Sequence, residues 1–332
     1  MLFVDSGGGT DAHLNLALEE HVLRHRMGED DLLLFYVNAP AIIIGRNQNT
    51  IEEIAEDAVL AHGIRVVRRV SGGGAVYHDL GNLNFSFMTR DVSGRFNRYD
   101  TFNRPVVDAL RALGVPAELG GRNDILADGR KISGNAQFAA GDRMLSHGTL
   151  LLHSDLDAVT RALRPRPGKV ESKGVKSVRS RVANIGEFLA APLTVDQLQD
   201  RILEGIFGTA DRARIPTLPL GPASRAAAAA LRARKYGTWE WNYGENPASN
   251  VQRAQRFAAG EIDVRFDIQD GHIAGVRIFG DYLGRVDVGE LEAQLKGLPY
   301  TGEAVAAALD VRGVEDYFGG IAREEVLSVL GP

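Results

Sequence analysis

The chain has 332 residues, of which 44% are hydrophobic and 24% charged, so it can bury a core for one large domain or two smaller ones. A net charge of −5 argues against a general nucleic-acid-binding protein. The absence of cysteine excludes disulfides, zinc–thiolate sites, cysteine-bound iron–sulfur clusters and every thiol nucleophile. We find no bilayer-spanning apolar run and no signal peptide, and therefore expect a cytoplasmic protein.

The first predicted element is a helix over 13–23, which Asp11 can cap. Its apolar side chains repeat every four residues and form one buried stripe. Glu19 and Glu20 are interpreted as part of a solvated face rather than as a catalytic pair.

Two strand-like runs follow at 32–37 and 41–44. The second leads into a polar stretch, 45–49, which either lines a cleft or forms a plain turn. A helix over 51–62 then leads to a short apolar strand at 64–67.

Three adjacent glycines, at 72–74, follow Arg68 and Arg69 in a loop that ends in an alternating strand at 82–87. Glycines lack side chains that would repel a ligand, and their backbone N–H groups can point into a cavity. Arginine can hold phosphate or carboxylate through two parallel hydrogen bonds. The loop is therefore either an anion site or a flexible hairpin tip with surface arginines.

An Asp–Gly turn at 128–129, between Ile125–Leu126 and Lys131–Ile132, predicts a tight hairpin. Period-two alternation places Lys131 and Ser133 on one face, with Asn123 and Asp124 on the approach to the paired strand. The hairpin thus either gathers a lysine, a hydroxyl, an amide and a carboxylate near one spot, or presents a solvated face.

Two further polar segments stand out. His147, in an interruption at 146–149, either contacts a ligand or ends a strand. A segment at 161–181 holds eight basic residues broken up by proline and glycine, which predicts a long, positively charged loop. That loop is either a lid over a polyanion such as a nucleoside triphosphate or a solvated linker.

The remaining pattern sets the fold class. Helices are predicted at 102–113, after Asp155, at 194–207 behind a capping box, and at 224–234; two strands at 261–268 and 272–279 and helices at 288–295, 302–308 and 323–330 follow a junction at 236–250. We predict an α/β (α+β) protein with a mixed, largely antiparallel sheet flanked by helices, plus a small α+β C-terminal domain. The domains are placed at 1–247 and 248–332.

Together these loops resemble the lipoate–protein ligase A family of the biotin/lipoate ligase superfamily. The matching motifs are RRVSGGGAVYHDLGN at 68–82, GRND at 121–124 with KISG at 131–134, HGTLL at 147–151, and SKGVKSVRSRV at 172–182. The stretch 239–244 and the strands after Phe257 are similar to the accessory C-terminal domain of full-length bacterial ligases. The resemblance therefore implies a catalytic domain at 1–247, for adenylation and acyl transfer, and an accessory domain at 248–332.

The resemblance implies a two-step reaction. Lipoate attacks the α-phosphate of ATP to give lipoyl-AMP and pyrophosphate, and a carrier lysine then takes the lipoyl group and releases AMP. No enzyme nucleophile is needed, which suits a chain without cysteine. ATP with Mg²⁺ is implied as the substrate complex, with no tightly bound organic cofactor. The implied partners are lipoate or octanoate, lipoyl domains of 2-oxoacid dehydrogenase E2 subunits and the H protein of glycine cleavage; we expect a monomer without nucleic-acid or membrane partners.

The same resemblance assigns site residues. Lys131 is implied as the catalytic residue, and Asp124 as the candidate Mg²⁺ ligand. The implied lipoate pocket comprises Arg69, Ser71, Gly73, Gly74, Ala75, His78, His147 and Gly148. The implied ATP or AMP contacts are Arg46, Val76, Tyr77, His78, Asn123, Asp124, Lys131, Ser133, Lys173, Lys176, Ser177 and Arg179.

Three alternatives remain. Octanoyl or lipoyl transferases resemble this chain but use a cysteine nucleophile, which it lacks. A biotin ligase shares the fold and the adenylate chemistry, although the HGTLLL stretch and the basic segment favour lipoate. A non-catalytic lipoyl-domain binding protein would keep the pocket, and Lys131 argues against it.

Overall fold

A computed structural model describes residues 1–90, 92–163, 181–243 and 250–331. Its largest sheet contains β1 (Leu2–Asp5), β2 (Leu32–Val37), β6 (Asn82–Thr89), β7 (Ala117–Gly120), β8 (Asp124–Ala127), β9 (Arg130–Ala140), β10 (Arg143–Leu151) and β11 (Thr217–Leu218). Their spatial order is β11-β1-β2-β6-β10-β9-β8-β7. Only β1 pairs in parallel, with β2 and β11, and the other neighbours are antiparallel. The predicted mixed, largely antiparallel sheet is therefore confirmed.

Two further sheets accompany the large one. The first, in the order β4-β3-β5, consists of β3 (Ala41–Ile44), β4 (Arg65–Arg68) and β5 (Val76–His78). The second is antiparallel, in the order β12-β13-β14, and consists of β12 (Val251–Phe257), β13 (Gly260–Gln269) and β14 (His272–Gly280). The two strands expected after 260 are confirmed, whereas β12 was not predicted, because most of its side chains are polar and exposed.

The helices described are α1 (Ala12–His25), α2 (Thr50–Glu53), α3 (Glu56–Ala61), α4 (Val92–Arg95), α5 (Tyr99–Ala112), α6 (Leu156–Ala162), α7 (Val195–Phe207), α8 (Pro222–Leu231), α9 (Trp239–Asn242), α10 (Gly289–Leu295), α11 (Gly302–Leu309), α12 (Val314–Phe318) and α13 (Arg323–Leu330). Asp11 accepts hydrogen bonds from the first turn of α1, as expected. The capping box of Thr194 and Gln197 at the start of α7 is also confirmed. Within the described residues, no helix is both long and apolar enough to cross a membrane.

The helix expected at 51–62 is interrupted. Ile54 and Ala55 are extended, and they divide it into α2 and α3. Ile54 forms a bridge with Leu163, and the backbone N–H of Ala55 donates to the carbonyl of Ala162. These pairings with the end of α6 replace hydrogen bonds that a continuous helix would make.

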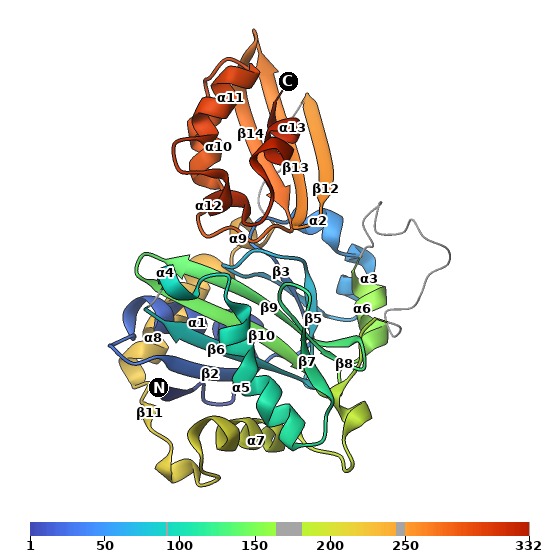
Figure 1. Ribbon diagram of the computed structural model, residues 1–332, viewed down its shortest axis with the longest axis vertical. Helices are drawn as coiled ribbons and strands as arrows, with labels where there is room; N and C mark the ends of the chain where they lie inside the picture. The colour runs from blue at the N-terminus through green and yellow to red at the C-terminus, as the bar shows by residue number, and fades with distance from the viewer. Residues whose placement is uncertain (91, 164–180, 244–249, 332) are drawn as a thin grey trace.

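Helices cover both faces of the large sheet (Figure 1). Alternation along the strands sends Phe35, Phe85 and Phe87 to one face, where they pack against α5 and α7. Leu34 and Tyr36 point to the opposite face, which packs against α1, α8 and the β4-β3-β5 sheet. Strands therefore border both sides of the space between the large sheet and the β4-β3-β5 sheet.

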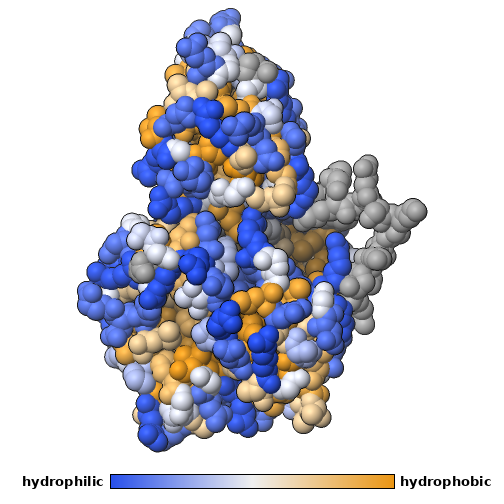
Figure 2. Space-filling model, viewed as in Figure 1, coloured by the Kyte–Doolittle hydropathy of each residue, from blue (hydrophilic) through white to orange (hydrophobic). Residues whose placement is uncertain are grey.

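The C-terminal part packs around its own core, in which α10 to α13 cover the β12-β13-β14 sheet. It lies above the rest of the molecule in the view of Figure 1. Figure 2 shows that hydrophilic residues dominate this face of both parts, with smaller apolar patches between them. The boundary predicted between 247 and 248 lies outside the described residues.

Candidate active site

A cavity of about 380 Å³ lies between the large sheet and the β4-β3-β5 sheet. It is bordered by residues assigned from the sequence, namely Arg69, Gly73, Gly74, Ala75, Val76, His78, Asn123, Asp124, Lys131, His147 and Gly148. The cavity thus brings together residues from four separate motifs. Their roles stay predictions, but their meeting in one space is a property of the fold.

The hairpin that carries Lys131 closes as predicted. Asp128 and Gly129 both have positive φ angles, 48° and 73°, as a two-residue turn between twisted strands requires. The register of β8 with β9 then shifts, so that Ile125 pairs with Ser133 and Leu126 with Lys131. This irregularity interrupts the alternation on which the expected shared face of Lys131 and Ser133 depends. Lys131 borders the cavity, whereas Ser133 is fully buried.

Lys131 places a cation at the cavity. Its Nζ lies 2.8 Å from Oδ1 of Asp124, and both side chains are about one-third exposed, at 37% and 30%. The backbone of Lys131 is held by the neighbouring segment, because its N–H donates to the carbonyl of Arg181 and its own carbonyl accepts from the N–H of Ala183. The side chain can therefore reach a ligand without moving the strand.

The assignment of Asp124 as a Mg²⁺ ligand stays a prediction. Asp124 offers carboxylate oxygen, the ligand type that Mg²⁺ prefers. In the described ranges, no group of three or more His, Cys, Asp or Glu residues could hold a metal ion.

The glycine loop is tightly packed rather than open. A Cβ on Gly45 would lie 1.8 Å from the carbonyl oxygen of Gly73, and a Cβ on Gly72 would lie 2.4 Å from that of Tyr282. The N–H of Gly73 donates to the same Tyr282 carbonyl at 3.2 Å. A Cβ on Gly74, by contrast, would meet nothing within 4 Å. Of these glycines, Gly74 therefore leaves free space beside the cavity.

Arg69 stabilises this loop, because its donors are already hydrogen-bonded within the protein. Its guanidinium donates to the carbonyls of Ile43, Gly72 and Gly74 at 3.1, 2.6 and 2.9 Å, and its Nε donates to Oγ of Ser71 at 3.0 Å. Burial lowers its pKa to about 10, which leaves it cationic at neutral pH. Neither interpretation of the loop, as an anion site or a flexible tip, describes this arrangement.

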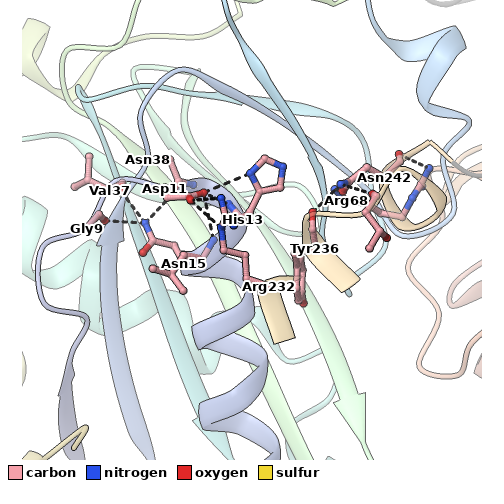
Figure 3. Close-up of polar contacts among 12 residues, drawn as sticks. Gly9, Asp11, His13, Asn15, Val37, Asn38, Arg68, Arg232, Tyr236 and Asn242 are labelled. Atoms are coloured by element: carbon pink, nitrogen blue, oxygen red, sulfur yellow. Dashed lines mark hydrogen bonds and ion pairs between the residues drawn. The ribbon is translucent and has the colours of Figure 1, made fainter. Parts of the chain in front are cut away.

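Arg68 also connects separate segments of the chain, and Figure 3 shows it beside Asn242, whose Oδ1 accepts a hydrogen bond from the backbone N–H of Arg68. It is 6% exposed and donates to the carbonyls of Gly45, Gln48 and Trp241 at 2.9, 2.7 and 2.9 Å, and to Oγ1 of Thr50 at 2.7 Å. Burial lowers its pKa to about 9. Arg68 therefore joins the polar stretch after β3 to the segment that contains α9.

A buried polar chain runs behind the cavity. Nδ1 of His147 lies 3.1 Å from both carboxylate oxygens of Glu19, and Nε2 lies 2.6 Å from Oγ of Ser71. Tyr36 OH donates to the same carboxylate at 3.3 Å. Ser71 does not itself border the cavity, but it contacts His147 and Arg69, which do.

The expectation of a solvated face at Glu19 and Glu20 is wrong. The two residues are 1% and 4% exposed. Glu20 pairs with Lys235 at 2.6 Å and accepts from Tyr236 OH at 2.7 Å. Helical periodicity could not reveal these partners, because they lie far away in the sequence.

Several assigned residues lie elsewhere. Arg46 pairs with Asp287 at 2.6 Å and stacks over Trp241, beside a second cavity between the two parts of the molecule. Tyr77 packs in an apolar cluster with Ile42 and other side chains near α3 and α6. The basic residues and serine assigned to ATP at positions Lys173, Lys176, Ser177 and Arg179 lie outside the described residues, as does most of the predicted basic loop.

Other cavity residues were not expected from the sequence. Tyr36 and Asn84 come from strand interiors, where an alternating pattern looks the same with or without a ligand. Arg256 and Asp281 come from the C-terminal part, where no cluster of catalytic residue types is evident in the sequence. The C-terminal part therefore supplies residues to the border of the cavity.

Comparison with known proteins gives the family. The family described as "Lipoyl protein ligase A/B catalytic domain" matches residues 11–207, and "Bacterial lipoate protein ligase C-terminus" matches 246–330. The lipoate–protein ligase LplJ of Bacillus subtilis is 47% identical over 330 residues, covering 99% of this chain and 100% of the relative.

Two solved structures are also similar. The bipartite lipoate protein ligase of Thermoplasma acidophilum, described with its E2 lipoyl domain, has a TM-score of 0.64 and 32% identity over 75% of this chain and 98% of its own. A lipoate–protein ligase A bound with ATP has a TM-score of 0.58 and 31% identity over 74% of this chain and 97% of its own. With matches to both parts of the chain and a relative that it covers from end to end, the chain belongs to the lipoate–protein ligase family.

Proposed function

We propose that the chain is an ATP-dependent ligase that joins lipoate to AMP and then transfers the lipoyl group to a lysine of a lipoyl carrier domain. The observation that carries this proposal is the position of Lys131, whose ammonium stands at a cavity bordered by the family's motifs. Relatives named lipoate–protein ligases along the full length support it, as does the ATP bound in a similar structure.

In the first step, a lipoate carboxylate oxygen attacks the α-phosphorus of ATP while the bond to pyrophosphate breaks. Negative charge gathers on the oxygens around phosphorus, and the catalytic contribution is positioning and charge neutralisation. Lys131 is the side chain that supplies positive charge there. Asn123 and Asp124 lie beside it, and Asp124 would bind the Mg²⁺ that accompanies ATP.

In the second step, the neutral amine of a carrier lysine attacks the carbonyl carbon of lipoyl-AMP. The amide bond forms, the bond to the phosphate oxygen breaks, AMP leaves, and the amine loses a proton. The carriers proposed are lipoyl domains of 2-oxoacid dehydrogenase E2 subunits and the H protein of glycine cleavage. The E2 lipoyl domain described with the Thermoplasma ligase supports this class of partner.

We assign the catalytic work to 1–247 and an accessory role to 248–332. Separate apolar cores and separate family matches support this division. The residue-level assignments made from the sequence belong to the same proposal.

Release of pyrophosphate tests the function. Purified protein with ATP and Mg²⁺ is expected to release pyrophosphate when lipoate is added, and the parallel reactions with octanoate and biotin give the order of preference. Mass spectrometry of a lipoyl domain then detects transfer to its lysine. Acyl transfer from an acylated carrier without ATP would instead identify a transferase.

Gly74→Val is expected to weaken lipoate binding by about 10- to 100-fold and ATP binding far less. The new side chain would enter the open space beside the cavity, which the acyl chain is proposed to use. Calorimetric titration with each ligand separately measures the two affinities. Gly28→Val is the matched control, because a Cβ on Gly28 also meets nothing within 4 Å but Gly28 is exposed and does not border the cavity. Equal losses for lipoate and ATP would contradict an acyl-binding role for this position.

A further inference from the structure

His78 presents an unused ring nitrogen beside the cavity. The side chain is 4% exposed, stands at the end of β5 and borders the cavity. Its Nδ1 lies 3.0 Å from Nδ2 of Asn38. Its Nε2 is buried and has no hydrogen-bond partner among the residues that the structure describes. A buried polar atom without a partner is costly, so a ligand atom is the natural partner for this one.

The proton on His78 can be assigned from the backbone. One terminal atom of the Asn15 side chain lies 2.9 Å from the carbonyl oxygens of both Gly9 and Val37 (Figure 3). Carbonyl oxygens only accept hydrogen bonds, so this atom must be the amide nitrogen Nδ2. The reverse orientation would place three oxygens against one another.

The orientation of the Asn15 amide determines the orientation of the Asn38 amide, and with it the protonation of His78. The same nitrogen of Asn15 lies 2.9 Å from the near atom of the Asn38 side chain, which must therefore be the acceptor Oδ1. Asn38 then turns its NH₂ group toward His78 and donates to Nδ1. A ring nitrogen that accepts carries no proton, so the neutral ring of His78 holds its proton on Nε2.

The charge state of His78 agrees with this geometry. Burial, with the neighbouring charge of Arg69 and the ring of His147, lowers its pKa to about 3, so that the ring is neutral at physiological pH. At His147, the other cavity histidine, Nδ1 faces a hydrogen-bond acceptor instead of a donor. His147 places Nδ1 against the Glu19 carboxylate, an acceptor, and Nε2 against Ser71. His147 is thus occupied at both ring nitrogens, while His78 keeps one N–H free.

We propose that Asn15 and Asn38 are positioning residues that hold His78 in its Nε2–H form, as a fixed neutral donor to an acceptor atom of the bound acyl adenylate. The identity of the ligand rests on the proposed function, whereas the protonation pattern does not. A neutral donor suits an oxygen that is already close to Lys131 and other cations, because it orients the ligand without adding charge. Outer-shell partners that orient a metal-ligating histidine commonly matter about 10- to 100-fold, and we expect an effect of the same order for the partners of His78.

The protonation pattern is tested directly by ¹⁵N NMR of the histidine side chains, with His78→Gln used to assign the signals. The expected spectrum shows His78 with an unprotonated Nδ1 and a protonated Nε2, unchanged between about pH 5 and 8. Addition of lipoate and ATP is expected to shift the Nε2 signal. A protonated Nδ1 in the free protein, or a ring that titrates in this range, would overturn the proposal. If the protein fails to release pyrophosphate, the proposed function fails but this spectrum still decides the protonation pattern.

Asn38→Asp tests the consequence for activity. A carboxylate at this position accepts from Nδ1 and so moves the neutral ring's proton from Nε2 to Nδ1. Above the pH range in which the altered ring is charged, kcat/KM for pyrophosphate release is expected to fall by about 10- to 100-fold. Asn103→Asp is the matched control, because Asn103 is a buried asparagine of α5 away from the cavity border. Full activity in Asn38→Asp with an inverted ring would overturn the role of Nε2–H; if that variant does not fold, the wild-type spectrum alone remains decisive.

Discussion

Lys131→Ala is expected to lower lipoate-dependent pyrophosphate release by at least about 10²–10³-fold, the usual effect of removing one oriented donor to a developing negative charge. Fold stability should change little. The ion pair of Lys131 with Asp124 is about one-third exposed, and pairs of this kind contribute about 0–1 kcal/mol. The loss therefore reports on the chemical step rather than on folding.

Arg130→Ala provides the control for this substitution. Arg130 is the neighbouring cation on β9, but its guanidinium pairs with Glu187 at 2.7 Å and it does not border the cavity. Its removal should leave pyrophosphate release within about twofold of the wild type. If Lys131→Ala kept more than a tenth of the activity while remaining folded, Lys131 would not be the catalytic cation.

Arg68→Lys is expected to destabilise the protein by about 2–4 kcal/mol, although it preserves the charge. Lysine has three donors on a single atom and cannot reach every acceptor of the guanidinium at once. Buried acceptors such as the carbonyls of Gly45 and Trp241 would lose their partners, at about 1–3 kcal/mol each. The midpoints of urea and thermal unfolding measure the change.

Arg65→Lys is the matched comparison. Arg65 is exposed at the other end of the same strand, so this change should alter stability by no more than about 0.5 kcal/mol. Equal unfolding midpoints for the two variants would show that the fork of hydrogen bonds at Arg68 adds nothing beyond a buried charge.

Local signals in the sequence predicted local structure well. The Asp–Gly turn at 128–129, the Asp11 cap and the capping box of Thr194 depend on residues within a few positions of one another. Each was predictable because one short segment contains both partners of every hydrogen bond involved. The resemblance to a family then gave Lys131 and the glycine loop their expected roles, and the fold brings both to one cavity.

Contacts between distant segments were not predictable in this way. Arg68 looked like an anion-binding arginine, because the sequence around it does not reveal its hydrogen-bond acceptors. One of them is the carbonyl of Trp241, which is 173 residues away in the sequence. Glu19 of α1 looked solvated because its partner His147 lies on β10, more than a hundred residues away. The register shift at Lys131 follows from how two strands pair, which the composition of neither strand reveals.

The contact between the glycine loop and the C-terminal part bears on how the protein is made. Gly73 and Tyr282 share a hydrogen bond, and Arg256 and Asp281 border the cavity from the same side. Domains generally fold as they leave the ribosome, the N-terminal one first. A nascent chain that has completed the large sheet therefore carries the glycine loop before Tyr282 can contact it, and Arg256 and Asp281 join the border of the cavity only after the C-terminal part has been made.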